Sequence, residues 1–160
     1  MLSDERQILN LLHRYCELQD AADFVGVAEL FRHSSYIVAG GESHFGFDEV
    51  YALKTKHDRT YDDGTLRTKH VTTNTILEID DGDLRATARS YFTVLQATPE
   101  LPLQPVIAGR YHDAFEKADG AWRFHERVIY GDLIGDLTRH LRDNPLDSGQ
   151  LDSGRLDQST

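Results

Sequence analysis

Cysteine is nearly missing from this chain of 160 residues, since Cys16 is the only one, and this excludes an internal disulfide. The histidines are scattered without the HExxH spacing or the clustered carboxylates of a metal site, so we expect no metal. Glycine-rich phosphate loops and a GxSxG elbow are also missing, and no other cofactor is expected.

Long hydrophobic runs are missing as well, and none approaches the length that spans a membrane. The opening segment, MLSDERQILNLL, carries acids where a secretion signal carries bases, so we expect no such signal. Together with the single cysteine, these features favour a cytoplasmic protein.

Basic residues are few relative to acidic ones, 17 against 27, which gives a formal net charge of −10. Such a charge repels nucleic-acid phosphates and anionic lipids, so we expect neither a nucleic acid nor a membrane as partner. A small neutral or hydrophobic substrate is easier to accommodate.

What the chain does contain is enough apolar residues, 39%, to build the core of one domain. We place this domain at residues 1–142. The remaining residues, 143–160, repeat the motif LDSG and hold few large apolar side chains, which predicts a flexible C-terminal tail.

The first half of the domain reads as helical. Ser3 followed by two acids is a typical helix start, and an apolar stripe then recurs at helical spacing: Ile8, Leu11, Leu12, Tyr15 and Leu18. Asp20 falls near the end of this helix, where its side chain could point inward. Asp23 is a candidate cap for a second helix, a short strand follows at about 35–38, and a third helix is expected at 47–57.

The second half reads as a four-stranded meander rich in β-branched residues, with strands at about 67–79, 84–97, 106–117 and 121–133. Asp81-Gly82 and Asp119-Gly120 are typical of tight hairpin turns. The segment TPELPLQP is expected to form an exposed edge or rim rather than a strand, because its prolines cannot donate to a ladder. Helices first and sheet second predict an α+β fold.

Strand alternation places His70, Thr72, Asn74 and Ile76 on one face of the first long strand, and this face is unusually polar for a core. If it faces the helices it lines a cavity, and Asp20 could reach His70. A carboxylate beside an imidazole fixes its tautomer and stabilises its protonated form, as a general base requires. The alternative is a structural Asp–His bond.

Two further candidates are weaker. Tyr15 belongs to the apolar stripe, so its ring is expected in the core, but its hydroxyl could reach the pocket. Arg110 and His112 share one face of the third long strand, and His112 becomes a candidate acid only if that face is inward. For Arg110 a structural ion pair is the favoured interpretation.

Several segments resemble the SnoaL-like branch of the nuclear transport factor 2 superfamily: ILNLLHRYCELQDAADFVGVAELF, KHVTTNTILEI, ARSYF and AGRYHDAFEKADGAWRFHERVIYGDLIGDL. The resemblance covers about residues 5–135. It implies a cone-shaped α+β barrel, with the N-terminal helices packed in a curved, mostly antiparallel sheet around a deep pocket. It also implies a homo-oligomer, a dimer or a trimer, commonly paired through the outer sheet face.

Scytalone dehydratase, bile acid 7α-dehydratase and hexachlorocyclohexane dehydrochlorinase are similar in using an Asp–His pair. The resemblance assigns Asp20 and His70 to those two positions, and it matches Tyr15 to a tyrosine of the bile acid enzyme. A pocket acid of that enzyme is replaced here by Val94 or Thr93, so bile acid specificity is not expected.

The resemblance therefore implies a lyase, dehydratase-like and independent of cofactors, in which His70 removes a carbon-bound proton and Asp20 orients it. Tyr15 would polarise a substrate oxygen, and His112 is the weaker candidate acid. The substrate would be a small hydrophobic or polycyclic molecule. An isomerase or cyclase of the same fold is an alternative. So are two non-catalytic roles, a scaffold like the β subunit of ring-hydroxylating dioxygenases and a ligand-binding domain.

Overall fold

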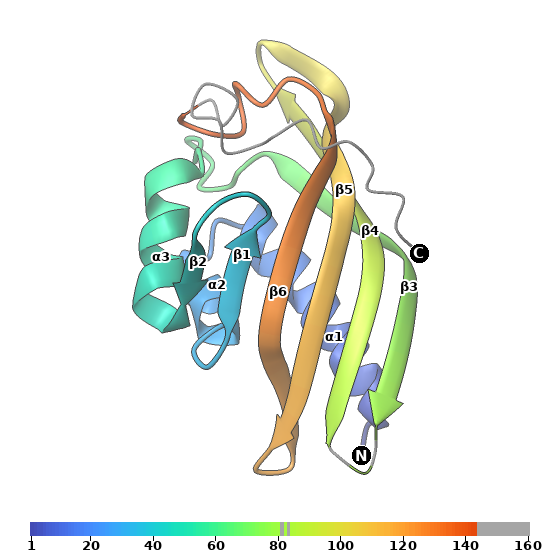
Figure 1. Ribbon diagram of the computed structural model, residues 1–160. Coiled ribbons are helices and arrows are strands. Elements are labelled where there is room, and N and C mark those ends of the chain that lie inside the picture. The colour runs from blue at the N-terminus through green and yellow to red at the C-terminus, as the bar shows by residue number, and fades with distance from the viewer. Residues whose placement is uncertain (81, 83, 144–160) are drawn as a thin grey trace.

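The computed structural model describes residues 1–80, 82 and 84–143, so the predicted tail lies outside the described residues apart from its first residue (Figure 1). The helices are α1 (Asp4–Asp20), α2 (Phe24–Leu30) and α3 (Gly46–His57). The strands are β1 (Ser35–Val38), β2 (Ser43–Phe45), β3 (Thr68–Asp80), β4 (Arg85–Thr98), β5 (Leu101–Ala118) and β6 (Ala121–Ile134). No helix in the described part of the chain is long and apolar enough to cross a membrane.

The first two helices begin where the sequence predicted. The Ser3 hydroxyl accepts a hydrogen bond from the backbone N–H of Arg6, and the Asp23 carboxylate accepts one from that of Gly26. These side chains satisfy amide groups that have no partner inside the helix, which fixes the starts of α1 and α2.

All six strands form one curved sheet in the order β2-β1-β6-β5-β4-β3. The pairing is antiparallel except between β1 and β6, which run parallel. In Figure 1 the helix α1 crosses one face of the long strands, and α2 and α3 lie together beside the short β1–β2 hairpin. This arrangement confirms the predicted cone-shaped α+β fold.

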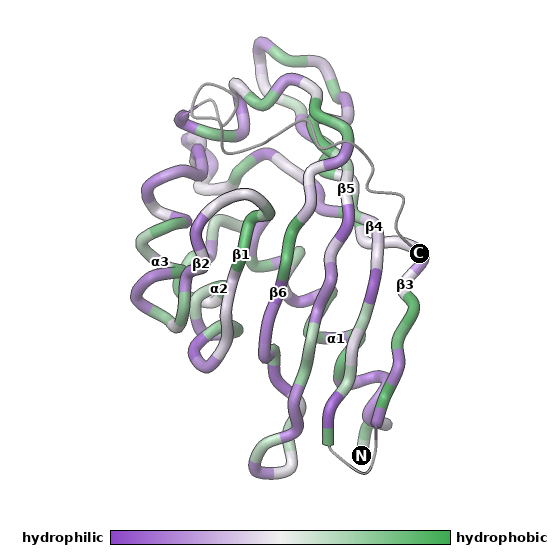
Figure 2. Tube along the Cα trace, in the orientation of Figure 1, coloured by the Kyte–Doolittle hydropathy of each residue, from purple (hydrophilic) through white to green (hydrophobic). Residues whose placement is uncertain are grey.

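The core lies between α1 and the concave face of the sheet. Every second residue of β4 from Ala86 to Thr98 is buried, and Figure 2 shows hydrophobic and hydrophilic positions mixed along each strand, as expected when one face is covered. The predicted core residues Trp122 and Phe124 of β6 are 6% and 0% exposed. The apolar stripe of α1 packs onto this face and fixes the position of the helix.

The alternation predicted for β3 is correct only in its first half. The pairing with β4 shifts between Thr73 and Ile76, and Asn74 has a positive φ of 41°, so the strand contains a β-bulge. One extra residue reverses the side-chain phase. Asn74 and Ile76 are therefore exposed, whereas Leu77 packs against the core.

The prediction that TPELPLQP lies outside a strand is wrong, because β5 begins at Leu101 and pairs with β4 through Pro105. The ladder to β6 starts only at Ile107, so the first residues of β5 form the edge of the sheet. A proline is tolerated there because its missing N–H can face away from the ladder.

The turn predicted at Asp119-Gly120 joins β5 and β6, and both residues have positive φ, 51° and 79°. The other predicted turn contains Asp81, which lies outside the described residues. The strand β2 was not predicted.

Candidate active site

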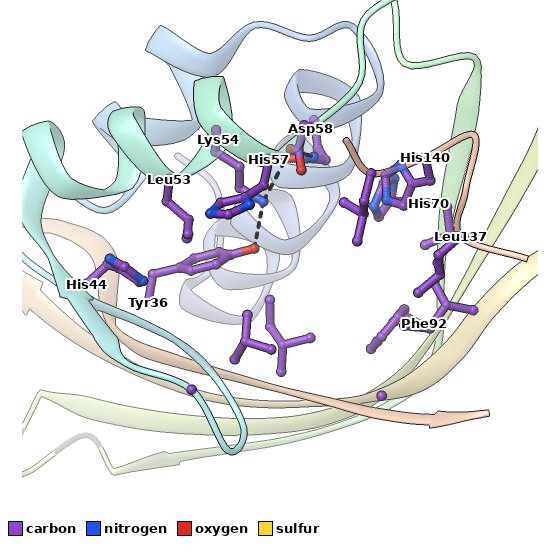
Figure 3. Close-up of a pocket in the computed structure, with 18 of the residues that line it drawn as sticks. Tyr36, His44, Leu53, Lys54, His57, Asp58, His70, Phe92, Leu137 and His140 are labelled. Carbon is purple, nitrogen blue, oxygen red and sulfur yellow. Dashed lines mark hydrogen bonds and ion pairs between the residues drawn. The ribbon is translucent and has the colours of Figure 1, made fainter. Parts of the chain in front are cut away.

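A cavity of about 510 Å³ lies between the end of α1, the β1–β2 hairpin, α3 and the long strands (Figure 3). Much of its lining is apolar and comes from Val38, Leu53, Phe92, Val94, Ile107, Ile129, Leu137 and Leu141. Several polar side chains also reach it, among them Tyr15, Gln19, Tyr36, Lys54, Asp58, His70 and His140. An apolar pocket with a few convergent polar groups is typical of a small-molecule site.

The C-terminal turn of α1 sets Asp20 beside this cavity. The N–H of Asp23 donates to the carbonyl of Leu18 at 2.9 Å, and the N–H of Ala22 donates to that of Gln19 at 3.0 Å, the pairing of a Schellman motif. Ala22 adopts the left-handed conformation that this motif requires, with φ 55°. The backbone of Asp20, the last residue of the helix, is thereby held at the start of β3.

The Asp20 carboxylate makes four hydrogen-bond contacts to β3. Its Oδ1 accepts from the Thr68 hydroxyl at 2.7 Å and lies 2.5 Å from Nδ1 of His70. Both carboxylate oxygens also face the backbone N–H of His70, Oδ2 at 2.9 Å. This network assigns the proton to Nδ1, which donates to Asp20, and it leaves Nε2 of the cavity-lining His70 for a ligand.

Electrostatics keep Asp20 ionised. Burial by itself would raise the pKa of this carboxyl, but the hydrogen bonds and charge of His70 and the Thr68 hydroxyl outweigh burial and lower the pKa. A carboxylate that stays charged can stabilise an imidazolium ring on the same contact. The structure thus brings the predicted pair together.

A second polar group starts from Tyr15, whose hydroxyl lies 2.9 Å from that of Tyr36. Nζ of Lys54 donates to the Tyr36 hydroxyl at 2.7 Å, as marked in Figure 3. The ring of Tyr15 is also perpendicular to that of His70, with centroids 6.4 Å apart. The predicted Tyr15 therefore has its ring in the core and its hydroxyl in a chain that adjoins the Asp–His pair.

Lys54 is anchored by Asp58, one helical turn later. Their charged groups are 3.7 Å apart, and Asp58 also accepts a hydrogen bond from the Gln19 side chain at 2.6 Å. Burial acts to lower the pKa of Lys54, but Asp58 and the two tyrosines oppose it, and the net result is a raised pKa. Lys54 is thus a charged ammonium group inside the protein.

His140 lies on the turn after β6 and closes the cavity beside His70, with ring centroids 6.0 Å apart (Figure 3). Its Nδ1 is buried and has no hydrogen-bond partner among the described residues. Burial lowers the pKa of His140 to about 4, so the ring is neutral at physiological pH.

Behind the tyrosines lies a buried ion pair of Arg127 and Asp113, joined by two hydrogen bonds of 2.7 and 2.9 Å. The guanidinium carbon of Arg127 is 4.4 Å from the ring centroid of Tyr15 and 3.9 Å from that of Tyr111. This arginine supports the tyrosine side of the site from within the core.

His112 lies away from the site. Residues of β5 alternate, with Tyr111 and Asp113 buried on the inner face, and His112 lies on the outer face against Tyr130. The condition under which it was a candidate acid, an inward-facing strand face, is not met. The ion pair expected for Arg110 is confirmed, because it binds Asp132 at 2.8 Å on the same outer face.

Lys54, Tyr36 and His140 were not among the predicted site residues. Lys54 follows the buried Val50 by four residues, so helical spacing could have placed it inward. Tyr36 lies in a predicted strand too short to define its face. His140 follows the last strand, where the sequence carries no periodic signal.

Comparison with known proteins assigns the chain to a family. The model of the SnoaL-like domain matches residues 1–128. A search of curated proteins finds no match.

Among solved structures, a variant of Rv3472 from Mycobacterium tuberculosis, a protein of unknown function, is 27% identical with a TM-score of 0.69, over 82% of this chain and 73% of that one. LinA is 18% identical with a TM-score of 0.65, over 83% and 88% of the two chains. ActVI-ORFA from Streptomyces coelicolor is 19% identical with a TM-score of 0.65, over 80% and 96%. The last two likenesses show a shared fold. The family match covers most of the chain, so this protein belongs to the SnoaL-like domain family.

Proposed function

We propose that this protein is a lyase, independent of cofactors, that dehydrates a small hydrophobic or polycyclic substrate with His70 as its general base. The observation that carries the proposal is the Asp20–His70 pair, bonded through Nδ1 at 2.5 Å at the wall of a largely apolar cavity. An imidazole held in this way presents Nε2 to a ligand and has a carboxylate behind it to stabilise the charge it gains.

In the proposed reaction, Nε2 of His70 takes a proton from a carbon next to a carbonyl group. The electrons of the C–H bond move into a carbon–carbon double bond, and the electrons of the carbonyl bond move onto its oxygen. The intermediate then collapses, the bond to the hydroxyl on the neighbouring carbon breaks, and this hydroxyl leaves with the proton from His70 as water. The base is regenerated, and no oxidant or reductant is needed.

The hydroxyls of Tyr15 and Tyr36 are the groups that would hold the substrate oxygen. Both residues line the cavity, and their hydroxyls are 2.9 Å apart. A hydrogen bond donated to an oxygen on which charge develops stabilises the transition state more than the ground state. Burial raises the pKa of Tyr15 well above its ordinary value, so this hydroxyl keeps its proton and can donate it in a hydrogen bond.

An isomerase would use the same first step and return the proton to another carbon, so the same residues support it. The two reactions differ in their products, because only the dehydratase releases water. The scaffold interpretation predicts instead that the protein co-purifies with an iron–sulfur α subunit.

The test is turnover of a panel of bicyclic and tricyclic β-hydroxyketones in deuterium oxide, followed by mass spectrometry for loss of water and for deuterium uptake. His70→Gln and Asp20→Asn should reduce the rate by about 10²- to 10⁴-fold, the usual contribution of general base catalysis. His13→Gln, at an exposed position on α1, should leave the rate unchanged. Full activity in both dyad variants would exclude the mechanism.

A further inference from the structure

Lys54 is unusual because it is a charged side chain at a buried position that an apolar side chain could occupy. The residue is 6% exposed, on the inner side of α3. Removing an ammonium group from water is expensive unless partners replace its hydration. The partners of this lysine therefore indicate why a charge is kept at this position.

The shortest polar contact of Lys54 is to a phenol and not to a carboxylate. Its Nζ is 2.7 Å from the Tyr36 hydroxyl but 3.7 Å from the nearest oxygen of Asp58. Nζ also lies over the Tyr36 ring, 4.7 Å from its centroid, and 5.9 Å from that of Tyr15. The charge is thus directed at the two tyrosines, while Asp58 is held in place by Gln19.

The direction of the hydrogen bonds follows from the chemistry of the groups. An ammonium group can only donate, so the Tyr36 oxygen must accept from Lys54. The proton of Tyr36 is then free to be donated, either to Tyr15 or into the cavity that both tyrosines line. A positive charge behind a hydroxyl makes that hydroxyl a stronger donor.

A purely structural ion pair explains this arrangement poorly. Buried ion pairs are weak sources of stability, and well-packed apolar residues of similar volume often replace them without loss. Nor does the lysine suit covalent catalysis, because its pKa is raised and a nucleophilic amine must be neutral.

We propose that Lys54 is a positioning residue that acts through Tyr36 and makes the cavity select ligands with a negatively charged oxygen, such as phenolates and enolates. The proposal rests on the proposed function, since the same hydroxyls would hold the oxygen of the enolate intermediate. It adds the source of the charge that stabilises that oxygen.

The experiment uses para-nitrophenol, a flat aromatic probe whose phenolate absorbs visible light and whose neutral form does not. Titration of the full chain with the dye, monitored by absorbance at several pH values, gives separate affinities for the two forms. The wild-type protein should bind the phenolate at least tenfold more tightly than the phenol. Lys54→Met should reduce the phenolate affinity by roughly 10- to 100-fold, the usual effect of losing a charged hydrogen-bond donor, and leave the phenol affinity nearly unchanged.

Two variants serve as controls. Lys54→Met combined with Asp58→Asn removes both charges and leaves no buried carboxylate without its cation, so it serves if the single variant fails to fold. Lys56→Met removes the same charge from an exposed lysine that also borders the cavity, so it measures the effect of charge alone. It should retain the phenolate preference to within about twofold, because an exposed charge is screened by solvent.

Loss of the preference in the folded Lys54 variants, with retention in Lys56→Met, supports the proposal. An undiminished preference in a folded Lys54 variant overturns it, as does a wild-type protein that binds the phenol more tightly or binds neither form. His70→Gln should keep the phenolate preference. The turnover experiment can therefore contradict the proposed role of His70 and Asp20 without affecting the dye-binding result for Lys54, and the reverse also holds. A preference that disappears in His70→Gln and persists in Lys54→Met assigns the charge to His70 and also overturns the proposal.

Discussion

The two ends of α1 differ in what they bury against the same sheet. The first half packs the apolar Ile8 and Leu12 into the core, and its start is tied to the end of β5 by an ion pair of Asp4 with Lys117 at 2.9 Å. The last turn meets the start of β3 with Asp20. We refer to the region around Ile8 and Leu12 as the packed half. The last turn of α1, together with the side chains from other elements that line the cavity beside it, is the cavity half.

The difference lies in how each half uses burial. In the packed half, burial removes apolar area from water and stabilises the fold. In the cavity half, Lys54, Asp58 and His140 are nearly as buried, at 6%, 5% and 7% exposure, although burial is unfavourable for polar groups. Buried titratable groups that line a cavity are typical of functional sites, so the contrast supports the proposed site.

The largest expected effect comes from the Arg127–Asp113 pair. Arg127→Met should lower the free energy of unfolding by about 3–5 kcal/mol, because Asp113 would stay buried without its cation. Urea denaturation monitored by circular dichroism measures this. Adding Asp113→Leu should recover most of the loss, since a neutral pair leaves no unpaired charge. If the double variant were as unstable as the single one, the unpaired charge would not be the cause.

In the packed half, truncation of a buried apolar side chain should lower the free energy of unfolding more than loss of an exposed charge. Leu12→Ala should lower the free energy of unfolding by about 2–5 kcal/mol through the cavity it leaves, with para-nitrophenol binding unchanged. Arg14→Ala removes an exposed ion pair with Glu17 on the same helix and should change stability by less than about 0.5 kcal/mol. Equal losses in both variants would contradict the distinction between the halves.

The cavity half should respond to pH through His140. The pKa of this residue falls from an ordinary value of 6.5 to about 4 on burial, so the unfolded chain binds a proton more readily than the folded one between these values. The contribution of His140 to the free energy of unfolding is therefore fully present above about pH 6.5. It is lost as the pH falls towards 4, which lowers the stability by at most on the order of 3 kcal/mol. In His140→Leu, which cannot titrate here, this part of the pH dependence should disappear. Urea midpoints of the two proteins across that range test the prediction, and parallel curves would contradict it.

The features that the sequence predicted are those with a repeated pattern. The stripe of α1 and the β-branched runs of β3 to β6 predicted the core, and Asp20 and His70 fell within these periodic elements. That the two would meet depended on strand phase and on the family resemblance, because 50 positions separate them.

The features that escaped prediction have a local or a three-dimensional cause. The bulge at Asn74 depends on one backbone torsion, and the run of alternating residues around it gives no sign of it. The strand β5 can contain Pro105 because β6 ends before it reaches this residue, and the length of β6 is a property of the whole sheet. The role of Lys54 depends on Tyr36, which comes from a different element.

A small gain in stability is expected where α1 ends, at the join between its packed turns and the Asp20–His70 pair. Ala22 has a left-handed backbone, with φ 55°, which is unfavourable for a residue with a Cβ atom. Ala22→Gly should therefore raise the free energy of unfolding by about 0.5–1 kcal/mol, with turnover unchanged, because the Schellman turn that positions Asp20 is kept. Ala21→Gly is the matched control, since Ala21 has an ordinary helical φ of −77° and glycine there should destabilise the chain. If both glycines shifted the urea midpoint in the same direction, backbone strain at Ala22 would not explain the result. The position of the end of α1 would then depend on the contacts of Asp20 and not on the conformation of Ala22.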